Sequence, residues 1–356
     1  GLGDVYKRQF PQTLAVVTTR AIPQGIQIRT GKYGETELTP DTFACIVQYP
    51  NAGGNIEDYR AFVEKAHAAG CKVAVAADIL SLALLTPPGE WGADIVFGTT
   101  QRLGTPMFYG GPSAAYFATR DEYKRNMPGR IIGWSKDKYG KLCYRMALQT
   151  REQHIKREKA TSNICTAQAL LATMAGFYAV YHGPEGIRTI AGRIHSIAAF
   201  LEKEINKLGY RQMNAQYFDT LRFALPDNVS AQQVRTVALS KEVNLRYFKN
   251  GDVGMSIDET TDLAAVNVLL SIFGIAAGKD YTKAADIPES CTIAEAFRRQ
   301  SAYLTHEVFN KYHTETEMMR YIKRLDRKDI SLAHSMISLG SCTMKLNAAA
   351  EMLPLS

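Results

Sequence analysis

The chain has 356 residues, of which 46% are hydrophobic and 22% charged, and its formal net charge is +7. This length suits one large or two ordinary domains with a sizeable core, and no run of about 18 apolar residues indicates a membrane span. The six cysteines are scattered without a CxxC or other metal-ligand spacing, which favours a reducing compartment and no metal site. Acidic and basic residues are interleaved, and the cations of 151–159 are typical of a solvated helix face, so we expect no nucleic-acid partner.

The first half of the chain alternates predicted strands with predicted helices. Residues 1–9 (GLGDVYKRQ) resemble neither a signal peptide nor the start of a folded element, and we interpret them as a non-native leader. Hydrophobic patterns predict helices at 13–21 and 56–69, and strands at 25–30, 43–48, 72–77, 94–98 and 114–118. This alternation favours an α/β fold with a mostly parallel sheet. Ligands of such sheets bind beyond the carboxyl ends of the strands, so the polar residues there are candidate site residues.

The second half of the chain predicts a smaller domain. A helix at 162–179 is broken by His182-Gly183-Pro184, and a long helix follows at about 185–208. Strands are then predicted at 218–224, 245–248 and 253–256, and helices at 231–241 and 262–273. These patterns predict a large α/β domain over 10–185, a small α+β domain over 186–280 and a helical linker over 281–334.

Asp78 directly follows the predicted strand at 72–77. One interpretation is an N-cap for a helix that begins at Ile79. The other is a carboxylate that faces the ring nitrogen of pyridoxal phosphate (PLP), because a protonated ring nitrogen makes this cofactor a better electron sink. The residues leave both interpretations open.

The strand at 94–98 leads into a polar and then glycine-rich stretch, GTTQRLGTPMFYGGP. In many PLP enzymes of the aspartate aminotransferase type, a lysine in such a place forms the Schiff base with the cofactor. Here Gln101 and Arg102 occupy that place, and arginine stays protonated in proteins, so it cannot act as the amine. Backbone amides of the following loop could meet a phosphate, although a plain turn is the alternative. The candidate cofactor-binding residues of this stretch are Thr99, Thr100, Tyr109, Gly110 and Gly111.

The segment GSCTMK at 340–345 gathers a glycine, two hydroxyls, a thiol and a lysine. It could supply a nucleophile, an anion pocket or a positioning loop, and an ordinary surface loop is the alternative. The chain has no HExxH, GxSxG or GxxxxGK[ST] motif, which argues against a zinc peptidase, a serine hydrolase and a P-loop NTPase.

Four stretches resemble the P-protein family of the glycine cleavage system, and the likeness runs from about Phe10 to Leu353. They lie at 86–133, 149–172, 178–187 (YAVYHGPEGI) and 339–352 (LGSCTMKLNAAAEM). The resemblance implies two halves of one PLP-dependent transferase fold, of which only the carboxy-terminal half carries the PLP lysine. This chain resembles most of the amino-terminal half, with 335–356 as the start of the second.

The resemblance also implies an activity, which is PLP-dependent decarboxylation of glycine with transfer of the aminomethyl group to the lipoyl arm of the H-protein. By analogy of fold, the loop at 109–112 would reach the cofactor phosphate in the partner half. Residues Ser341, Thr343 and Lys345 would line the entry of glycine or of the carrier. The chain would be inactive alone, and would belong in the cytoplasm if bacterial, which we favour, or in the mitochondrial matrix if eukaryotic.

Two other functions remain open at this point. A self-sufficient PLP enzyme could use another lysine, such as Lys124 or Lys136, but neither lies where the strand order would put the cofactor. A non-catalytic scaffold half that stabilises a catalytic partner would share all the sequence features above. If the chain is part of a P-protein, whether as an enzyme component or as a scaffold, a basic face would suit an acidic carrier protein.

Overall fold

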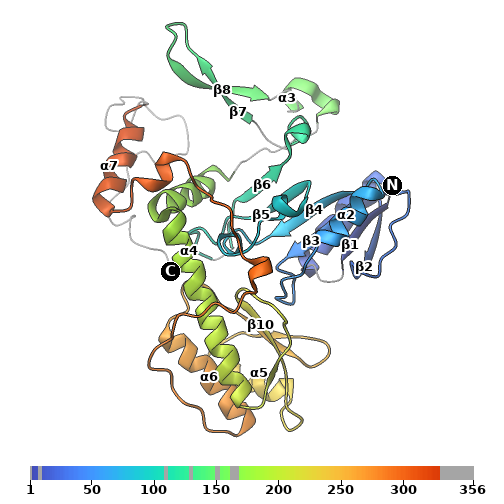
Figure 1. The fold of residues 1–356 in the computed structure, drawn as a ribbon, viewed down its shortest axis with the longest axis vertical. Helices are drawn as coiled ribbons and strands as arrows, with labels where there is room; N and C mark the ends of the chain where they lie inside the picture. Colours follow the sequence, from blue (N-terminus) through green and yellow to red (C-terminus); the bar gives the residue numbers. More distant parts are fainter. Residues whose placement is uncertain are drawn as a thin grey trace.

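The computed structural model describes residues 2–6, 10–107, 111–127, 131–148, 153–160 and 168–328. These residues form a large domain around a six-stranded sheet, a small domain around a four-stranded sheet, and a separate two-stranded hairpin (Figure 1). No helix among these residues is long and apolar enough to cross a membrane. Short 3-10 turns lie at Ile22–Gln24, Ser81–Ala83, Pro88–Trp91, Asp121–Tyr123, Arg157–Lys159, Glu295–Phe297 and Glu307–Asn310.

The large sheet is mostly parallel, as the sequence predicts. Its order is β2-β1-β3-β4-β5-β6, and only β6 runs antiparallel to its neighbour. The helix α2 (Arg60–Ala68) turns Phe62, Val63 and Ala66 toward the buried faces of β3 and β4. The strands are β1 (Leu2–Tyr6), β2 (Gln27–Gly31), β3 (Thr42–Tyr49), β4 (Lys72–Ala77), β5 (Ile95–Thr99) and β6 (Ala115–Thr119), and α1 spans Pro11–Ala21.

The first strand is a correction to the sequence analysis. Leu2–Tyr6 lies between β2 and β3 and pairs with both in parallel register. The expectation of no folded element in 1–9 is therefore wrong for this segment, while its non-native origin stays a prediction. Glycine and aspartate inside a strand hide its pattern, and pairing on both sides overrides their low strand propensity.

A kinked helix joins the two domains. The helix α4 (Ala169–Lys207) continues through Gly183, whose φ of 62° and ψ of −176° are not helical, and Pro184 follows. The predicted break at His182-Gly183-Pro184 is thus confirmed as a bend rather than an end. The predicted domain boundary at 185 falls two residues beyond it.

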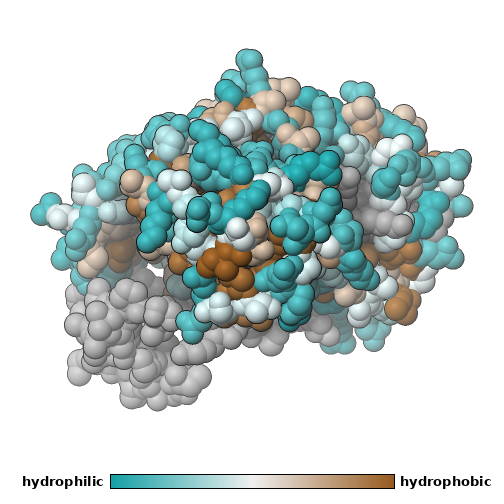
Figure 2. All heavy atoms as spheres, turned by 90° about the horizontal axis from the view of Figure 1, so that it is seen from below, coloured by the Kyte–Doolittle hydropathy of each residue, from teal (hydrophilic) through white to brown (hydrophobic). Residues whose placement is uncertain are grey.

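The small domain packs helices on an antiparallel sheet of order β11-β12-β10-β9. Its core contains the fully buried Phe218, Leu221, Phe223 and Phe273 beside the second part of α4. Figure 2 views the molecule from this end, where the surface is mostly hydrophilic. The elements are β9 (Arg211–Gln212), β10 (Thr220–Ala224), α5 (Ala231–Ser240), β11 (Arg246–Tyr247), β12 (Val253–Ser256) and α6 (Leu263–Ala277).

Two segments differ from the sequence-based expectation. The chain forms a hairpin of β7 (Ile131–Lys136) and β8 (Leu142–Leu148), followed by α3 (Gln153–Lys156), where no strand was predicted. Between 281 and 314, where a helical linker was predicted, only two 3-10 turns are helical, and α7 begins at Glu315 and ends at Asp326. The reason is that this segment crosses back to the large domain, where the amide of Thr86 donates to Phe297 O at 2.8 Å.

Candidate functional site

Three parallel strands of the large sheet end side by side at Tyr49, Ala77 and Thr99. Asp78 comes directly after β4, where its amide donates to the carbonyl oxygen of Tyr49 at 3.0 Å. Its carboxylate accepts a hydrogen bond from the amide of Leu80 at 3.0 Å, which closes a local turn. No helix begins at Ile79, and the N-cap of the 3-10 turn that follows is Leu80, so the predicted N-cap role of Asp78 is wrong. The second carboxylate oxygen faces the guanidinium of Arg102.

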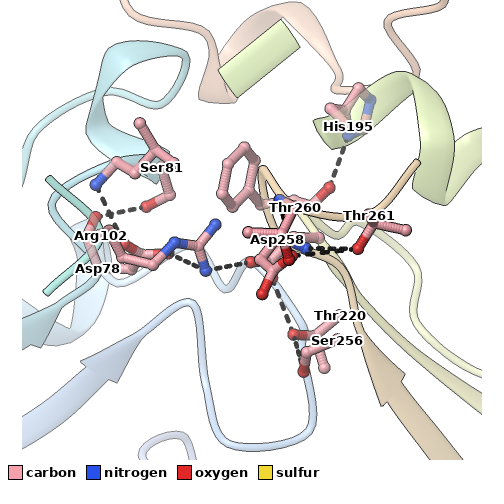
Figure 3. Close-up of polar contacts among 12 residues, drawn as sticks. Asp78, Ser81, Arg102, His195, Thr220, Ser256, Asp258, Thr260 and Thr261 are labelled. Atoms are coloured by element: carbon pink, nitrogen blue, oxygen red, sulfur yellow. Dashed lines mark hydrogen bonds and ion pairs between the residues drawn. The ribbon is translucent and has the colours of Figure 1, made fainter. Parts of the chain in front are cut away.

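Arg102 occupies the centre of this site and connects the two domains (Figure 3). Its Nη1 lies 3.5 Å from Asp78 Oδ2 in the large domain and 2.7 Å from Asp219 Oδ2 in the small domain. The side chain of Arg102 is 25% exposed, and that of Asp219 is 9% exposed. The guanidinium also lies 5.8 Å from the centre of the Phe218 ring. We call Asp78, Arg102 and Asp219 the charge triad.

The electrostatics of the charge triad keep Arg102 charged. Burial alone would lower the pKa of Arg102, but the charges of Asp78 and Asp219 outweigh burial and raise that pKa. Burial raises the pKa of Asp78, the charge of Asp219 adds to this, and Arg102 opposes it. One cation thus serves two carboxylates, and Asp258 adds a further negative charge near Arg102.

The small-domain side of the site is held by a hydrogen-bonded frame. Asp219 Oδ1 accepts a hydrogen bond from Thr220 Oγ1 at 2.8 Å, and Thr220 Oγ1 lies 2.9 Å from Ser256 Oγ. Asp258 Oδ1 accepts hydrogen bonds from the hydroxyls of Thr260 and Thr261, at 2.8 and 3.2 Å (Figure 3). These contacts orient the carboxylates of Asp219 and Asp258 within the small domain, independently of Arg102.

The large-domain side is held by close packing of backbones. The phenol of Tyr116 on β6 donates to the carbonyl oxygen of Ala77 at 2.8 Å, across β5. This crossing requires Gly98 on β5, since a Cβ at that position would lie 2.3 Å from Ala77 O and 2.8 Å from the Tyr116 ring. Burial raises the pKa of Tyr116, so its phenol stays protonated and remains a donor.

The loop after β3 docks on the small domain. Asn51 Oδ1 accepts from the amides of Gly53 and Asn55 at 2.8 and 3.1 Å, which closes a tight turn. Gly54 has a φ of +91°, and a Cβ there would lie 2.3 Å from the carbonyl oxygen of Thr220. The turn therefore brings the end of β3 against the start of β10, beside the charge triad.

The described candidate cofactor-binding residues lie at the end of β5 and in the turn between β5 and β6. Thr99 Oγ1 and Thr100 Oγ1 donate to the carbonyl oxygen of Ala114 at 3.4 and 3.1 Å, and Gln101 turns its amide toward Met107 Sδ. Gly111 has a φ of +60° and nothing near its missing Cβ. Tyr109, Gly110, Ser341, Thr343 and Lys345 lie outside the described residues. A role of these residues in binding the cofactor, glycine or a carrier stays a prediction.

Sequence reasoning missed Asp219 and Asp258. Asp219 is 117 residues from Arg102 in the chain, and it precedes a strand rather than following one. A search restricted to the carboxyl ends of the parallel strands could therefore not find it. The sequence offered one hint of a further carboxylate, which is that Arg102 needs an acidic partner once it is buried.

The chemistry of the charge triad does not fit a covalently bound PLP. A Schiff base needs a deprotonated amine, whereas Arg102 is cationic at every physiological pH. A pyridinium partner needs a carboxylate with a free face, whereas Asp78 already contacts Arg102 and the amide of Leu80. This site can hold charge and fix the two domains, but it offers no nucleophile.

The fold is that of the PLP-dependent transferases of the aspartate aminotransferase type. A C-DES mutant with glycine covalently linked to its PLP cofactor shares this fold, with a TM-score of 0.53 at 14% identity, covering 76% of this chain and 74% of that chain. The chain belongs to the glycine cleavage system P-protein family, whose model matches residues 4–273.

Two further comparisons support this family. The glycine dehydrogenase (decarboxylating) of Bacteroides fragilis is 84% identical over 347 residues, which are 98% of this chain and 37% of that protein. The crystal structure of a glycine decarboxylase (P-protein) of the glycine cleavage system in inhibitor-bound form has a TM-score of 0.69 at 31% identity. That match covers 76% of this chain and 65% of the other. The chain thus spans little more than a third of the length of the curated relative.

Proposed function

We propose that this chain is the half of a P-protein that does not carry the cofactor lysine. The complete protein decarboxylates glycine with PLP and passes the aminomethyl group to the lipoyl arm of an H-protein. The observation that carries the proposal is the ion pairing of the buried Arg102 with Asp78 and Asp219, and we propose that Arg102 takes the place of the lysine. The bacterial relative favours the cytoplasm as the location.

In the complete protein, PLP supplies an electron sink for the bond that loses CO2. The residues of this chain serve that chemistry indirectly, since the charge triad fixes the ends of β4 and β5 against the small domain. The hydroxyls of Thr99 and Thr100 hold the start of the turn after β5 to the carbonyl oxygen of Ala114. We propose that the loop at 109–112 reaches the cofactor phosphate of the other half, and that Ser341, Thr343 and Lys345 line the entry of glycine or carrier.

The first experiment mixes the purified chain with PLP, reduces the mixture with borohydride and locates adducts by mass spectrometry. We expect no lysine to carry PLP in stoichiometric amount, because the site offers no amine beside Asp78. A stoichiometric adduct on one lysine, such as Lys124 or Lys136, would overturn the proposal in favour of a self-sufficient enzyme. The complete protein serves as the positive control, and we expect one modified lysine outside this chain.

A scaffold role is the second candidate, and the charge triad favours it because Arg102 joins the two domains directly. The two candidates separate in the complete protein. If this half only stabilises its partner, Thr99→Val lowers the melting temperature and leaves PLP affinity and turnover unchanged. If it contributes to the active site, PLP affinity or turnover falls as well. Thr119→Val is the matched control, because Thr119 Oγ1 makes a similar hydrogen bond, to Asp94 O at 3.0 Å, at the opposite end of β6.

The proposed carrier contact has its own test. The chain carries a net charge of +7, which would attract an acidic carrier over the distance at which charges are not screened. Charge reversal of exposed cations in the complete protein is expected to raise the KM for the carrier and to weaken its dependence on salt. Unchanged carrier kinetics at low and high salt would exclude this contact.

A further inference from the structure

The hairpin of β7 and β8 carries an apolar face. Side chains two residues apart on a strand share a face, and the register pairs Ile132 with Met146 and Trp134 with Tyr144. Leu142 lies on the same face, opposite the stem of Lys136. The five large apolar side chains of this face are 44–73% exposed, and we call them the hairpin face: Ile132, Trp134, Leu142, Tyr144 and Met146.

The hairpin has no core to support this face. The rings of Trp134 and Tyr144 meet edge to face at 5.7 Å. Within the described parts of the chain, β7 and β8 pack extensively only against each other, and they project from the body of the molecule (Figure 1). A two-stranded hairpin alone is at best marginally stable in water, so this one requires a covering surface.

The hairpin face differs from the end of the molecule that Figure 2 shows. The end of the molecule seen in Figure 2 is mostly hydrophilic, with hydrophobic residues in small separate areas. On the hairpin, five large apolar side chains adjoin on a single face, and two of them are aromatic. Contiguous apolar area of this kind marks a protein–protein interface, and tryptophan and tyrosine are the residues that most often anchor one.

We propose that the hairpin face is the docking surface for the part of the parent polypeptide that lies outside this chain. This inference rests on the proposed function, in which the chain is one half of a larger protein. More than half the length of the Bacteroides fragilis relative lies outside the match, so in that protein a large further part of the same polypeptide is available as a permanent partner. A permanent partner keeps the face covered, whereas a carrier that leaves after each turnover would return it to water.

The charges around the hairpin face define the partner surface further. The hairpin carries four cations, Lys136, Lys138, Lys141 and Arg145, and a single carboxylate, Asp137. Two copies of the hairpin packed face to face would bring like charges together, which disfavours a second copy of this chain. The partner surface is therefore an apolar patch with carboxylates at its rim.

The test places the photo-crosslinking residue p-benzoylphenylalanine at position 134 of the complete protein, and at position 135 as the matched control. Ser135 is the next residue along β7 and points to the opposite face of the hairpin. After irradiation, the crosslinked peptides are identified by mass spectrometry. We expect position 134 to crosslink to peptides beyond this chain, in a region rich in apolar and acidic residues, with a severalfold lower yield from position 135.

Four results would overturn the inference. They are crosslinks of position 134 only within residues 1–356, crosslinks to the hairpin of a second copy, crosslinks that require added H-protein, and no crosslink above the control. Hydrogen exchange of residues 131–148 in the unmodified complete protein gives an independent readout, and exchange at the rate of a free hairpin would also overturn it. Neither measurement depends on turnover. The proposed activity is tested separately, by glycine-dependent CO2 release, so a failure of the docking surface can be told apart from a failure of the proposed function.

Discussion

At the scale of single residues, Arg102 determines what the site beyond β4 and β5 can do. A lysine there could lose its proton and become a nucleophile when buried, but arginine keeps its charge. Asp78 and Asp219 hold that charge from two domains, at 3.5 and 2.7 Å. Arg102 is thus a point of attachment between the two domains.

Replacing Arg102 with methionine tests this attachment. The substitution keeps apolar contact but leaves Asp78 and Asp219 without a cation. Removing one partner of a buried ion pair costs about 3–5 kcal/mol, and because Arg102 is a quarter exposed we expect a loss on the order of 2 kcal/mol. Arg102→Lys keeps the positive charge but not the planar guanidinium, so it should lower the free energy of unfolding by about half as much. Urea unfolding of the chain measures both, and equal stability of all three proteins would contradict the attachment.

The buried His195 gives the protein a pH-dependent stability. Its Nδ1 donates to Phe218 O at 2.8 Å and its Nε2 accepts from the amide of Thr292 at 3.0 Å, an arrangement that only neutral imidazole can make. Burial lowers the pKa of His195 below its ordinary 6.5. The unfolded chain therefore binds a proton first, and stability present above about pH 6.5 is lost as the pH falls below it.

His195→Gln should weaken this acid sensitivity. We expect the free energy of unfolding of the native protein to fall between pH 7.5 and pH 5.5 more steeply than that of the variant, whose amide does not titrate. Urea titrations at several pH values measure the two slopes. Parallel profiles would mean that other groups, such as His182, whose pKa burial also lowers, control the acid response.

The sequence predicts the large-domain residues of the site better than the small-domain residues. Asp78 and Arg102 follow strands with clear apolar patterns, and the predicted span of β4, 72–77, agrees with the structure at both ends. Asp219 enters through tertiary packing between domains, which no local pattern encodes. The predicted N-cap role of Asp78 fails because no helix begins at Ile79, and its two carboxylate oxygens instead contact the Leu80 amide and Arg102.

At the scale of elements, the helix α4 is the main connection between the domains. It has 39 residues, so its contour is about 60 Å long at 1.5 Å per residue. The φ and ψ of Gly183 lie in a region that is almost restricted to glycine. A Cβ at Gly183 would also lie 2.6 Å from both Phe309 O and His313 Cε1.

Gly183→Ala should therefore destabilise the protein strongly. The backbone strain is about 1–3 kcal/mol, and the collision with Phe309 O adds to it. Gly176→Ala on the same helix is the matched control, because nothing lies within 4 Å of its missing Cβ. We expect this control to gain up to about 1 kcal/mol from helix propensity. Thermal unfolding of both variants checks the difference, and a neutral Gly183→Ala would show that the bend is not required.

Secondary structure could be predicted where buried apolar residues recur with the period of a helix or a strand. It could not be predicted where such a pattern is missing. The helices α1, α2, α5 and α6 and the inner strands follow apolar patterns of helix or strand period. The strand β1 contains Gly3 and Asp4, and its place depends on its two neighbours. The hairpin was missed because its apolar face turns outward, so its pattern corresponds to a partner surface rather than to a core.

At the scale of the whole molecule, the exposed hairpin face should make the isolated chain aggregate non-specifically through other apolar surfaces, since the charges of the hairpin disfavour only an ordered face-to-face pair. Trp134 and Tyr144 are 69% and 73% exposed, and apolar area of this kind promotes aggregation in the absence of a partner. Joint replacement of both with serine should reduce concentration-dependent light scattering. Tyr139→Ser is the control, since Tyr139 is equally exposed at 74% but is not on the hairpin face. An equal decrease in scattering by the control would mean that general hydrophobicity, rather than this face, drives association.

The bend in α4 has a consequence for motion. Many two-domain enzymes open and close by a hinge at each turnover. In this chain, such a hinge would have to separate Gly183 from Phe309 and His313, and also pull Arg102 away from Asp219. Both sets of contacts lock the same angle between the domains. On the proposed function, this chain therefore stays rigid during turnover, and any opening that admits substrate would have to come from movement of the other half.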